Sequence, residues 1–267
     1  MCRSTSPRGI FTKRSDVCWS ASSWDPSSTS RGAVLYVPPE MKSLPILHRR
    51  NVLATVMVML TGLGIASGES PHAQQIKAFL KMHADAVPLI VIKDGKGDFS
   101  NWERFEAEVI DGDHVHVPKT SPRTKQEFGD FKLILEFKMD PGANSGIYLR
   151  GLGELQVLEN TAKQYAKLDP RQYHGSAYGL APAKRGHLKP VGEWNYQEVV
   201  VRGTTIVVHL NGTKILDTDL SKITHTMKDK EYSVSKKQKG ALVLGGHASG
   251  VFYRNMYVAE LEANTGH

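Results

Sequence analysis

The segment FKLILEFKM, residues 131–139, constrains the fold of this chain more than any other segment. From Phe131 to Met139 every second residue is apolar, and the residues between them are mostly charged. This period of two predicts a half-buried β-strand, with one face on a core and the other toward solvent. Because a strand satisfies its backbone groups by pairing, the chain must supply further strands to complete a sheet.

Further strand patterns occur at short spacing along the chain. An Asp111-Gly112 pair between two alternating segments predicts a β-hairpin. Alternating segments with intervening turn signals also occupy residues 198–216, 241–246 and 251–261. The chain therefore contains enough predicted strands for two packed sheets.

Helical spacing is confined to one short segment. In residues 73–85, Ile76, Phe79 and Leu80 recur at the intervals of one helix face. With many strands and almost no helix, we expect an all-β fold, a two-sheet jelly-roll sandwich preceded by a signal segment and one short helix. Residues 160–192 are long, polar and rich in Gly, Pro, Lys and His, and a connection of this kind usually covers or builds a site.

The first part of the chain predicts processing rather than a fold. Residues 1–40 are rich in Ser, Arg and Pro and have no period, so we expect a disordered leader there, with Met41 as a second candidate start. The basic stretch from Met41 and the uncharged apolar run that follows it predict an export signal peptide over 41–68. Arg49-Arg50 resembles a twin-arginine signal.

These patterns divide the chain and place it in the cell. After the signal we expect a short helix and linker over 69–90 and the jelly-roll domain over 91–267. The expected location is the periplasm or the extracellular space, reached by Sec or twin-arginine export, with membrane contact only during export. Oligomeric state is left open.

The net charge of +7 does not indicate a nucleic-acid partner. Residues 1–68 hold eight of the 34 basic and three of the 27 acidic residues, which leaves 26 basic against 24 acidic residues in the remainder. Both cysteines, Cys2 and Cys18, also precede the expected domain. That domain therefore has no disulfide, thiol nucleophile or cysteine metal site.

The stretch GANSGIYLRGLGELQVLEN, residues 142–160, carries the strongest signal for chemistry. If its two strand patterns pair, Tyr148, Arg150, Glu154 and Gln156 line one surface of the sheet. An arginine beside a carboxylate and an amide can bind hydroxyl groups and orient an acid or base. The alternative is a solvated outer face with a surface ion pair.

Glu159 lies five residues from Glu154, so a regular strand would direct the two side chains to opposite faces. A β-bulge between them would bring both carboxylates to one face. The string ELQVLE resembles the bulged signature of jelly-roll glucanases, in which two glutamates serve as nucleophile and acid/base about 5.5 Å apart. Gln156 stands where that signature has an aspartate.

A wider resemblance covers most of the chain after the signal. In order, TKQEFGDFKLILEF, NSGIYLRG, ELQVLEN, GSAYGL, KPVGEWN, VVHLNG and KGALVLGGHASGVFYRNMYV resemble segments of the 3-keto-disaccharide hydrolase domain family. That family is similar in fold to the concanavalin A-like lectins and glucanases, which have a sugar site on a concave face. The family usually has an aspartate where this chain has Glu159, and a polar residue where it has Gly245.

The resemblance implies cleavage of a glycoside already oxidised at C3. A base removes the acidified proton at C2, the enolate expels the aglycone at C1, and water adds to the unsaturated sugar. On this basis the expected catalytic residues are Glu154 or His247 as base, Arg150 as stabiliser of negative charge, and Glu159 as a second acid/base. The expected substrate-binding residues are Asn144, Tyr148, Gln156, Tyr178, Trp194 and Arg254.

Several alternatives stay open at this point. Trp194 could instead be a packed core residue, and Arg254 a structural ion pair. The whole chain could be a non-catalytic carbohydrate-binding module, or a retaining glucanase using Glu154 and Glu159. A surface interaction domain without a sugar site would be indicated by a buried, salt-bridged Arg150 and no open groove.

The sequence indicates no cofactor and no metal site. A Ca²⁺ ion is compatible with the fold family, but no run of ligands specifies one. The expected partners are a carbohydrate substrate and a separate sugar oxidoreductase that supplies the ketone.

Overall fold

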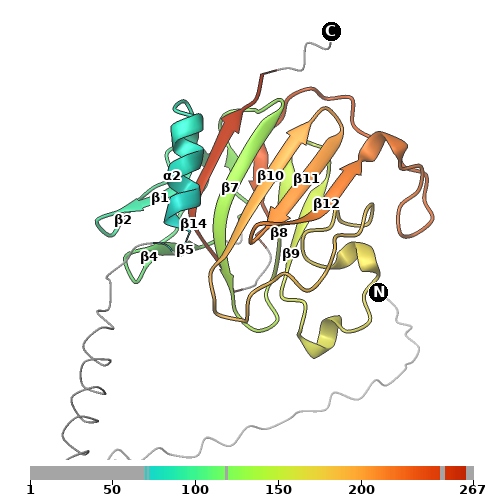
Figure 1. Ribbon diagram of the computed structural model, residues 1–267, viewed down its shortest axis with the longest axis horizontal. Helices are drawn as coiled ribbons and strands as arrows, with labels where there is room; N and C mark the ends of the chain where they lie inside the picture. Colours follow the sequence, from blue (N-terminus) through green and yellow to red (C-terminus); the bar gives the residue numbers. More distant parts are fainter. Residues whose placement is uncertain (1–69, 71, 118–119, 247–249, 263–267) are drawn as a thin grey trace, which may run out of the picture. The chain divides into compact units, whose positions relative to one another are not determined.

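The computed structural model describes residues 70, 72–117, 120–246 and 250–262, which form two antiparallel sheets packed face to face (Figure 1). The predicted all-β sandwich with one short helix is therefore confirmed. The expected leader and export signal lie outside the described residues. No helix within the described part has both the length and the apolar composition needed to cross a bilayer.

The larger sheet has nine strands, of which seven follow one path in the order β12-β11-β10-β7-β14-β1-β2, while β4 and β5 pair beside β14. Its strands are β1 (Val87–Lys93), β2 (Lys96–Asp98), β4 (Val109–Ile110), β5 (His114–His116), β7 (Phe131–Met139), β10 (Asn195–Arg202), β11 (Thr205–Leu210), β12 (Thr213–Asp219) and β14 (Val251–Glu260).

The smaller sheet has five strands in the order β3-β6-β13-β8-β9. They are β3 (Trp102–Glu103), β6 (Arg123–Thr124), β8 (Asn144–Leu149), β9 (Glu154–Leu158) and β13 (Leu242–Leu244). The described residues also contain three 3₁₀ turns: η2 (Lys163–Tyr165), η3 (Pro170–Gln172) and η4 (Leu220–Lys222).

The predicted turns set the register of the larger sheet. Asp111 and Gly112 both have positive φ, of 51° and 74°, and join β4 to β5 as the hairpin pattern predicts. Asn211 and Gly212 likewise join β11 to β12. β1 begins at Val87 and pairs with β14, so the sheet starts inside the segment that was expected to be helix and linker.

The core lies between the two sheets and contains the residues that the alternation predicts. Leu133, Leu135 and Phe137 of β7 are fully buried there, opposite Ile147 of β8 and Leu155 of β9. Burying a side chain of this size contributes about 2 kcal/mol, so these paired faces account for the stability of the sandwich.

The prediction that β7 is half-buried is wrong at its centre. Ile134 and Glu136 point away from the sandwich core, yet both are completely buried. The cause is helix α2 (Ala73–Met82), which lies against the outer face of the larger sheet (Figure 1). Its residues Ile76 and Phe79 pack on Ile134 in a second apolar cluster.

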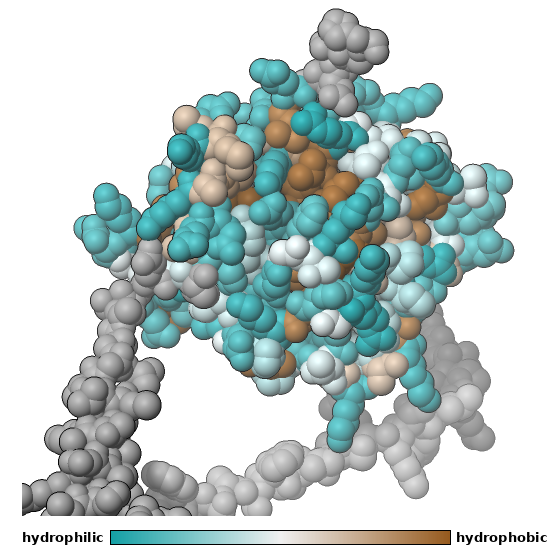
Figure 2. Space-filling view, in the orientation of Figure 1, coloured by the Kyte–Doolittle hydropathy of each residue, from teal (hydrophilic) through white to brown (hydrophobic). Residues whose placement is uncertain are grey.

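Hydrophilic side chains predominate on the face of the molecule seen in Figure 2, which also shows an apolar area over the strands of the larger sheet. Four large apolar or aromatic side chains are counted as exposed among the described residues: Met82, Tyr148, Tyr178 and Val191. Met82 is on α2, and the other three line cavities. Exposed side chains of this kind in a hollow indicate a place where a ligand binds.

Candidate functional site

Half of the ten sequence-predicted residues line one cavity of about 270 Å³ on the outer face of β8 and β9. The strands pair without a register shift, with Tyr148 opposite Glu154 and Gly146 opposite Gln156. Since Ile147 and Leu155 face the core, the alternate residues face outward. Five predicted residues line this cavity, namely Asn144, Tyr148, Glu154, Gln156 and Tyr178.

The long connection after β9 builds the far wall of the cavity. Its backbone pairs with the free edge of β9: the Tyr178 amide donates to the Glu154 carbonyl at 2.8 Å, and the Gln156 amide donates to the Ser176 carbonyl at 3.0 Å. This wall adds Tyr165, Leu168, Gln172 and Tyr178 to the cavity, so part of the connection over 160–192 lines it.

Glu154 and Tyr148 lie side by side in the cavity. Burial raises the pKa of the Tyr148 phenol, and the nearby Glu154 carboxylate, with which it shares a hydrogen bond, raises it further. Tyr148 therefore stays protonated at neutral pH and donates to Glu154. A carboxylate beside a neutral phenol supplies both a proton acceptor and a proton donor in one place.

The amides and hydroxyls of the cavity are arranged to bind a polar ligand. Gln156 Nε2 donates to Asn144 Oδ1 at 3.2 Å, and Gln172 Nε2 donates to the Tyr178 hydroxyl at 2.8 Å. These contacts orient the groups and leave other donor and acceptor positions of each group for a ligand. Sugar hydroxyls, which both donate and accept, match such a set.

The predicted placement of Arg150 on this face is wrong. Arg150 follows the end of β8 and has a φ of 40°, in the left-handed region, so the alternation of the strand no longer sets the direction of its side chain. Its guanidinium donates to the carbonyls of Lys237 and Gln238 at 2.9 and 2.8 Å and to that of Gly203, and it lies 3.7 Å from Asp130. Only 2% of Arg150 is exposed, so it joins loops rather than meeting a ligand.

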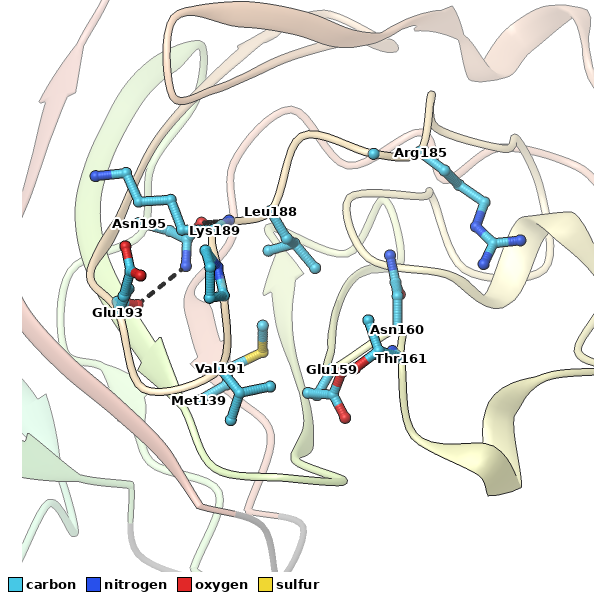
Figure 3. A pocket seen from close by; sticks show the side chains of 12 residues that line it. Met139, Glu159, Asn160, Thr161, Arg185, Leu188, Lys189, Val191, Glu193 and Asn195 are labelled. Carbon is cyan, nitrogen blue, oxygen red and sulfur yellow. Dashed lines mark hydrogen bonds between the residues drawn. The ribbon is translucent and has the colours of Figure 1, made fainter. Parts of the chain in front are cut away.

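The bulge that would bring Glu154 and Glu159 to one face is absent, because β9 keeps regular pairing with β8 through Leu158. Glu159 follows the end of the strand and lines a different, larger cavity of about 760 Å³ (Figure 3). Its carboxylate accepts from the Gly142 amide and from the amide and hydroxyl of Thr161. Although burial opposes it, these hydrogen bonds hold the pKa of Glu159 below its usual value.

Arg254 takes the structural role that was the alternative for it. It donates to the buried Glu136 at 3.0 Å and pairs with Asp113, on the outer face of the larger sheet. Burial would raise the pKa of Glu136, but hydrogen bonds from His72, Ser70 and Asn255 and the charge of Arg254 outweigh it and lower that pKa.

Trp194 is likewise outside the Glu154 cavity. Its ring stacks on the Arg254 guanidinium, 3.9 Å from the ring centroid, and Lys138 lies 5.1 Å from the same ring. It is half-buried and belongs to the charged cluster beside α2. A role as a sugar platform in the Glu154 cavity is therefore excluded by position.

His247, the other candidate base, lies outside the described residues. The described part of its segment ends close to the cavity, because the Gly245 amide donates to the Gly146 carbonyl at 2.7 Å. Among the described residues no group of three His, Cys, Asp or Glu side chains could hold a metal ion.

Sequence reasoning missed Tyr165, Leu168 and Gln172. They lie on the connection after β9, where no period predicts the direction of a side chain. The length and polarity of residues 160–192 indicated that this connection lines a cavity, but they did not indicate which of its residues do so. The capping box of η3, in which Asp169 accepts from the Arg171 amide, fixes Gln172 in position.

Comparison with known proteins identifies the family of this chain. Residues 88–259 match a family described as the 3-keto-alpha-glucoside-1,2-lyase-like domain. A protein from Bacteroides thetaiotaomicron named 3-keto-disaccharide hydrolase is 27% identical over 210 residues, covering 64% of this chain and 70% of that protein.

Two crystal structures from Parabacteroides distasonis, provisionally named glycosyl hydrolases, are similar in fold. One is 26% identical with a TM-score of 0.55 and covers 66% of this chain and 100% of its own. The other is 28% identical with a TM-score of 0.53 and covers 67% of this chain and 84% of its own. The match to the family spans β1 to β14 and contains the whole Glu154 cavity.

Proposed function

The chain belongs to the 3-keto-alpha-glucoside-1,2-lyase-like domain family, and from that premise we propose that it cleaves 3-keto-glycosides at the Glu154 cavity. One observation carries the proposal. Five residues expected from the sequence to act on a sugar converge on one cavity, with a carboxylate and a protonated phenol side by side. The cavity is at the small end of ligand-site volumes, which suits a single sugar ring.

Glu154 acts as the base. The ketone at C3 acidifies the C2 proton, so its C2–H bond breaks as the proton passes to the Glu154 carboxylate and the electrons form an enolate at C3. The enolate collapses, the C1–O bond to the aglycone breaks, a C1–C2 double bond forms, and the departing oxygen takes the proton that Glu154 removed from C2, which restores the carboxylate. Water then adds its oxygen to C1 and a proton to C2, and the net reaction is hydrolysis by way of an elimination.

Tyr148 replaces Arg150 as the group that meets developing negative charge. Its phenol is neutral, hydrogen-bonds Glu154 and is partly exposed to the cavity. A neutral donor directed at an oxygen that gains charge lowers the barrier by stabilising the enolate or the departing aglycone. Gln156, Asn144 and Tyr178 hold the hydroxyl groups of the ring.

The substrate requires a preceding oxidation at C3. We assign that oxidation to a separate sugar oxidoreductase. We also propose export to the periplasm or beyond, on the strength of the apolar run and basic stretch within residues 41–68. N-terminal sequencing of the mature protein tests this, since export requires loss of that segment.

The function is tested by aglycone release from a 3-keto-glucoside and from its unoxidised parent. We expect release from the keto substrate alone, lost in Glu154→Gln and retained in Glu159→Gln, with circular dichroism reporting on folding. Release from the parent sugar that needs both glutamates would instead support a retaining glucanase. Binding of either sugar without turnover would support a carbohydrate-binding module.

A further inference from the structure

The cavity of about 760 Å³ at the end of the sandwich has two unlike walls (Figure 3). Met139, Leu188 and Val191 make one wall apolar, and Val191 is 42% exposed there. The opposite wall carries Asn160 and Arg185. Neither cavity shares a lining residue with the other, so this cavity is separate from the Glu154 site.

Arg185 is held in place but lacks an acidic partner. Its guanidinium lies 3.7 Å from the centroid of the Tyr173 ring, and Tyr173 is itself buried and donates to the Tyr165 carbonyl at 3.0 Å. Within the described part of the chain no carboxylate pairs with Arg185. Arg185 is exposed at the edge of the cavity, so its N–H donors are available to a ligand.

The other polar groups of this wall also favour a ligand rich in acceptors. Asn160 Oδ1 already accepts from the His174 amide at 3.0 Å, which leaves its NH₂ group as the donor toward the cavity. Glu159 has its oxygens occupied by Gly142 and Thr161. In Figure 3 the Asn160 amide nitrogen lies between Arg185 and the Leu188 side chain.

We propose that this cavity is a second binding site, for a carboxylated sugar ring such as a uronic acid. The ligand carboxylate pairs with Arg185, the Asn160 amide donates to a ring hydroxyl or oxygen, and the apolar face of the ring packs on Leu188 and Val191. The choice of a sugar rests on the proposed function. The anionic group is inferred from Arg185, in a cavity that Lys189, Glu159 and Glu193 also line.

The test is an NMR titration of the ¹⁵N-labelled protein with methyl glucuronide, methyl glucoside and acetate. We expect methyl glucuronide to shift resonances of Arg185, Leu188 and Val191, and to bind at least about tenfold more tightly than either other probe. Arg185→Gln should lose that preference. The matched control Lys184→Gln, an exposed neighbour outside this cavity, should keep it.

Three outcomes would overturn the inference. They are equal binding of glucuronide and glucoside, equal binding of acetate, and shifts confined to Tyr148 and Tyr178. Glu154→Gln separates this site from the catalytic proposal, because it should abolish turnover and leave glucuronide binding unchanged. If the wild-type protein turns over the keto-glucoside but does not bind methyl glucuronide, this inference alone is refuted. If it binds methyl glucuronide but does not turn over the keto-glucoside, the catalytic proposal alone is refuted.

Discussion

The Glu154 carboxylate occupies the space in which a side chain at position 146 would lie, so only a glycine there permits its position. Gly146 faces the same side of β8 as Tyr148 and pairs with Gln156 of β9. The missing side chain allows the carboxylate to lie over the neighbouring strand, within reach of the Tyr148 phenol. A glycine thus sets the geometry of the proposed base.

Gly146→Ala should therefore cut turnover of a 3-keto-glucoside by about 100-fold, because a base displaced by about 1 Å loses that much rate. The displaced atoms belong to a flexible side chain, so the melting temperature should change little. Gly129→Ala is the matched control, since its nearest neighbour would be 3.6 Å from the new methyl group. Unchanged turnover in Gly146→Ala would show that the position of Glu154 is not critical.

Arg150 should matter for stability and not for chemistry. In Arg150→Lys a single ammonium nitrogen replaces the two guanidinium nitrogens that reach the carbonyls of two loops, so the free energy of unfolding in urea should fall by about 2 to 3 kcal/mol. The KM and kcat of the folded variant should match those of the wild type. An Arg150→Lys protein of normal stability but with no turnover would restore the catalytic role expected from the sequence.

The buried Glu136 should contribute far more to the free energy of unfolding than a surface ion pair does. Glu136→Gln removes the charge that faces Arg254, and we expect a loss of about 3 kcal/mol of unfolding free energy at neutral pH. The same substitution at Glu260, whose partner Lys239 is exposed, should cost less than about 1 kcal/mol. Equal losses in the two variants would contradict this difference.

Glu136 should also make stability depend on pH in the acid range. Because its folded pKa is lowered, its contribution is present above the ordinary carboxyl pKa. That contribution is lost as pH falls through the lower, folded value. Urea unfolding between pH 5 and pH 3 should therefore show a smaller loss in Glu136→Gln than in the wild type.

His174 should make the fold sensitive to milder acid. Burial lowers its pKa from 6.5 to about 4, and a hydrogen bond to Gln197 opposes that shift only in part. Between these values the unfolded chain binds a proton that the folded chain does not, so stability falls as pH falls. The unfolding free energy should drop by about 2 kcal/mol between pH 7 and pH 5 from this residue alone.

His174→Gln provides the check on that pH dependence. The variant should be less stable than the wild type at pH 7, because His174 accepts from the Leu158 amide in the core. The difference between the two proteins should shrink toward pH 5, since the variant has no imidazole to protonate. A difference that stays constant with pH would exclude His174 as the source.

Alternation along strands predicted which residues share a face, and this part of the site followed from the sequence. Asn144, Tyr148, Glu154 and Gln156 project from two paired strands whose core residues were recognisable. Alternation cannot tell solvent from another layer, however. The burial of Glu136 beneath α2 was missed for that reason.

The other errors lie where the strands end. Arg150 follows β8 in a left-handed conformation and Glu159 follows β9, so the period of two applies to neither. Gln172 and Tyr165 come from a connection whose course depends on tertiary contacts. A residue one step beyond a strand can point in any direction that its turn allows.

The most direct test of the account is the rate of aglycone release from a 3-keto-glucoside deuterated at C2. If Glu154 removes that hydrogen, kcat/KM for the deuterated substrate should be several-fold lower than for the ordinary one, and Glu154→Gln should release no aglycone from either. Equal rates for the two substrates, with Glu154→Gln still active, would contradict proton abstraction by Glu154 and refute the elimination.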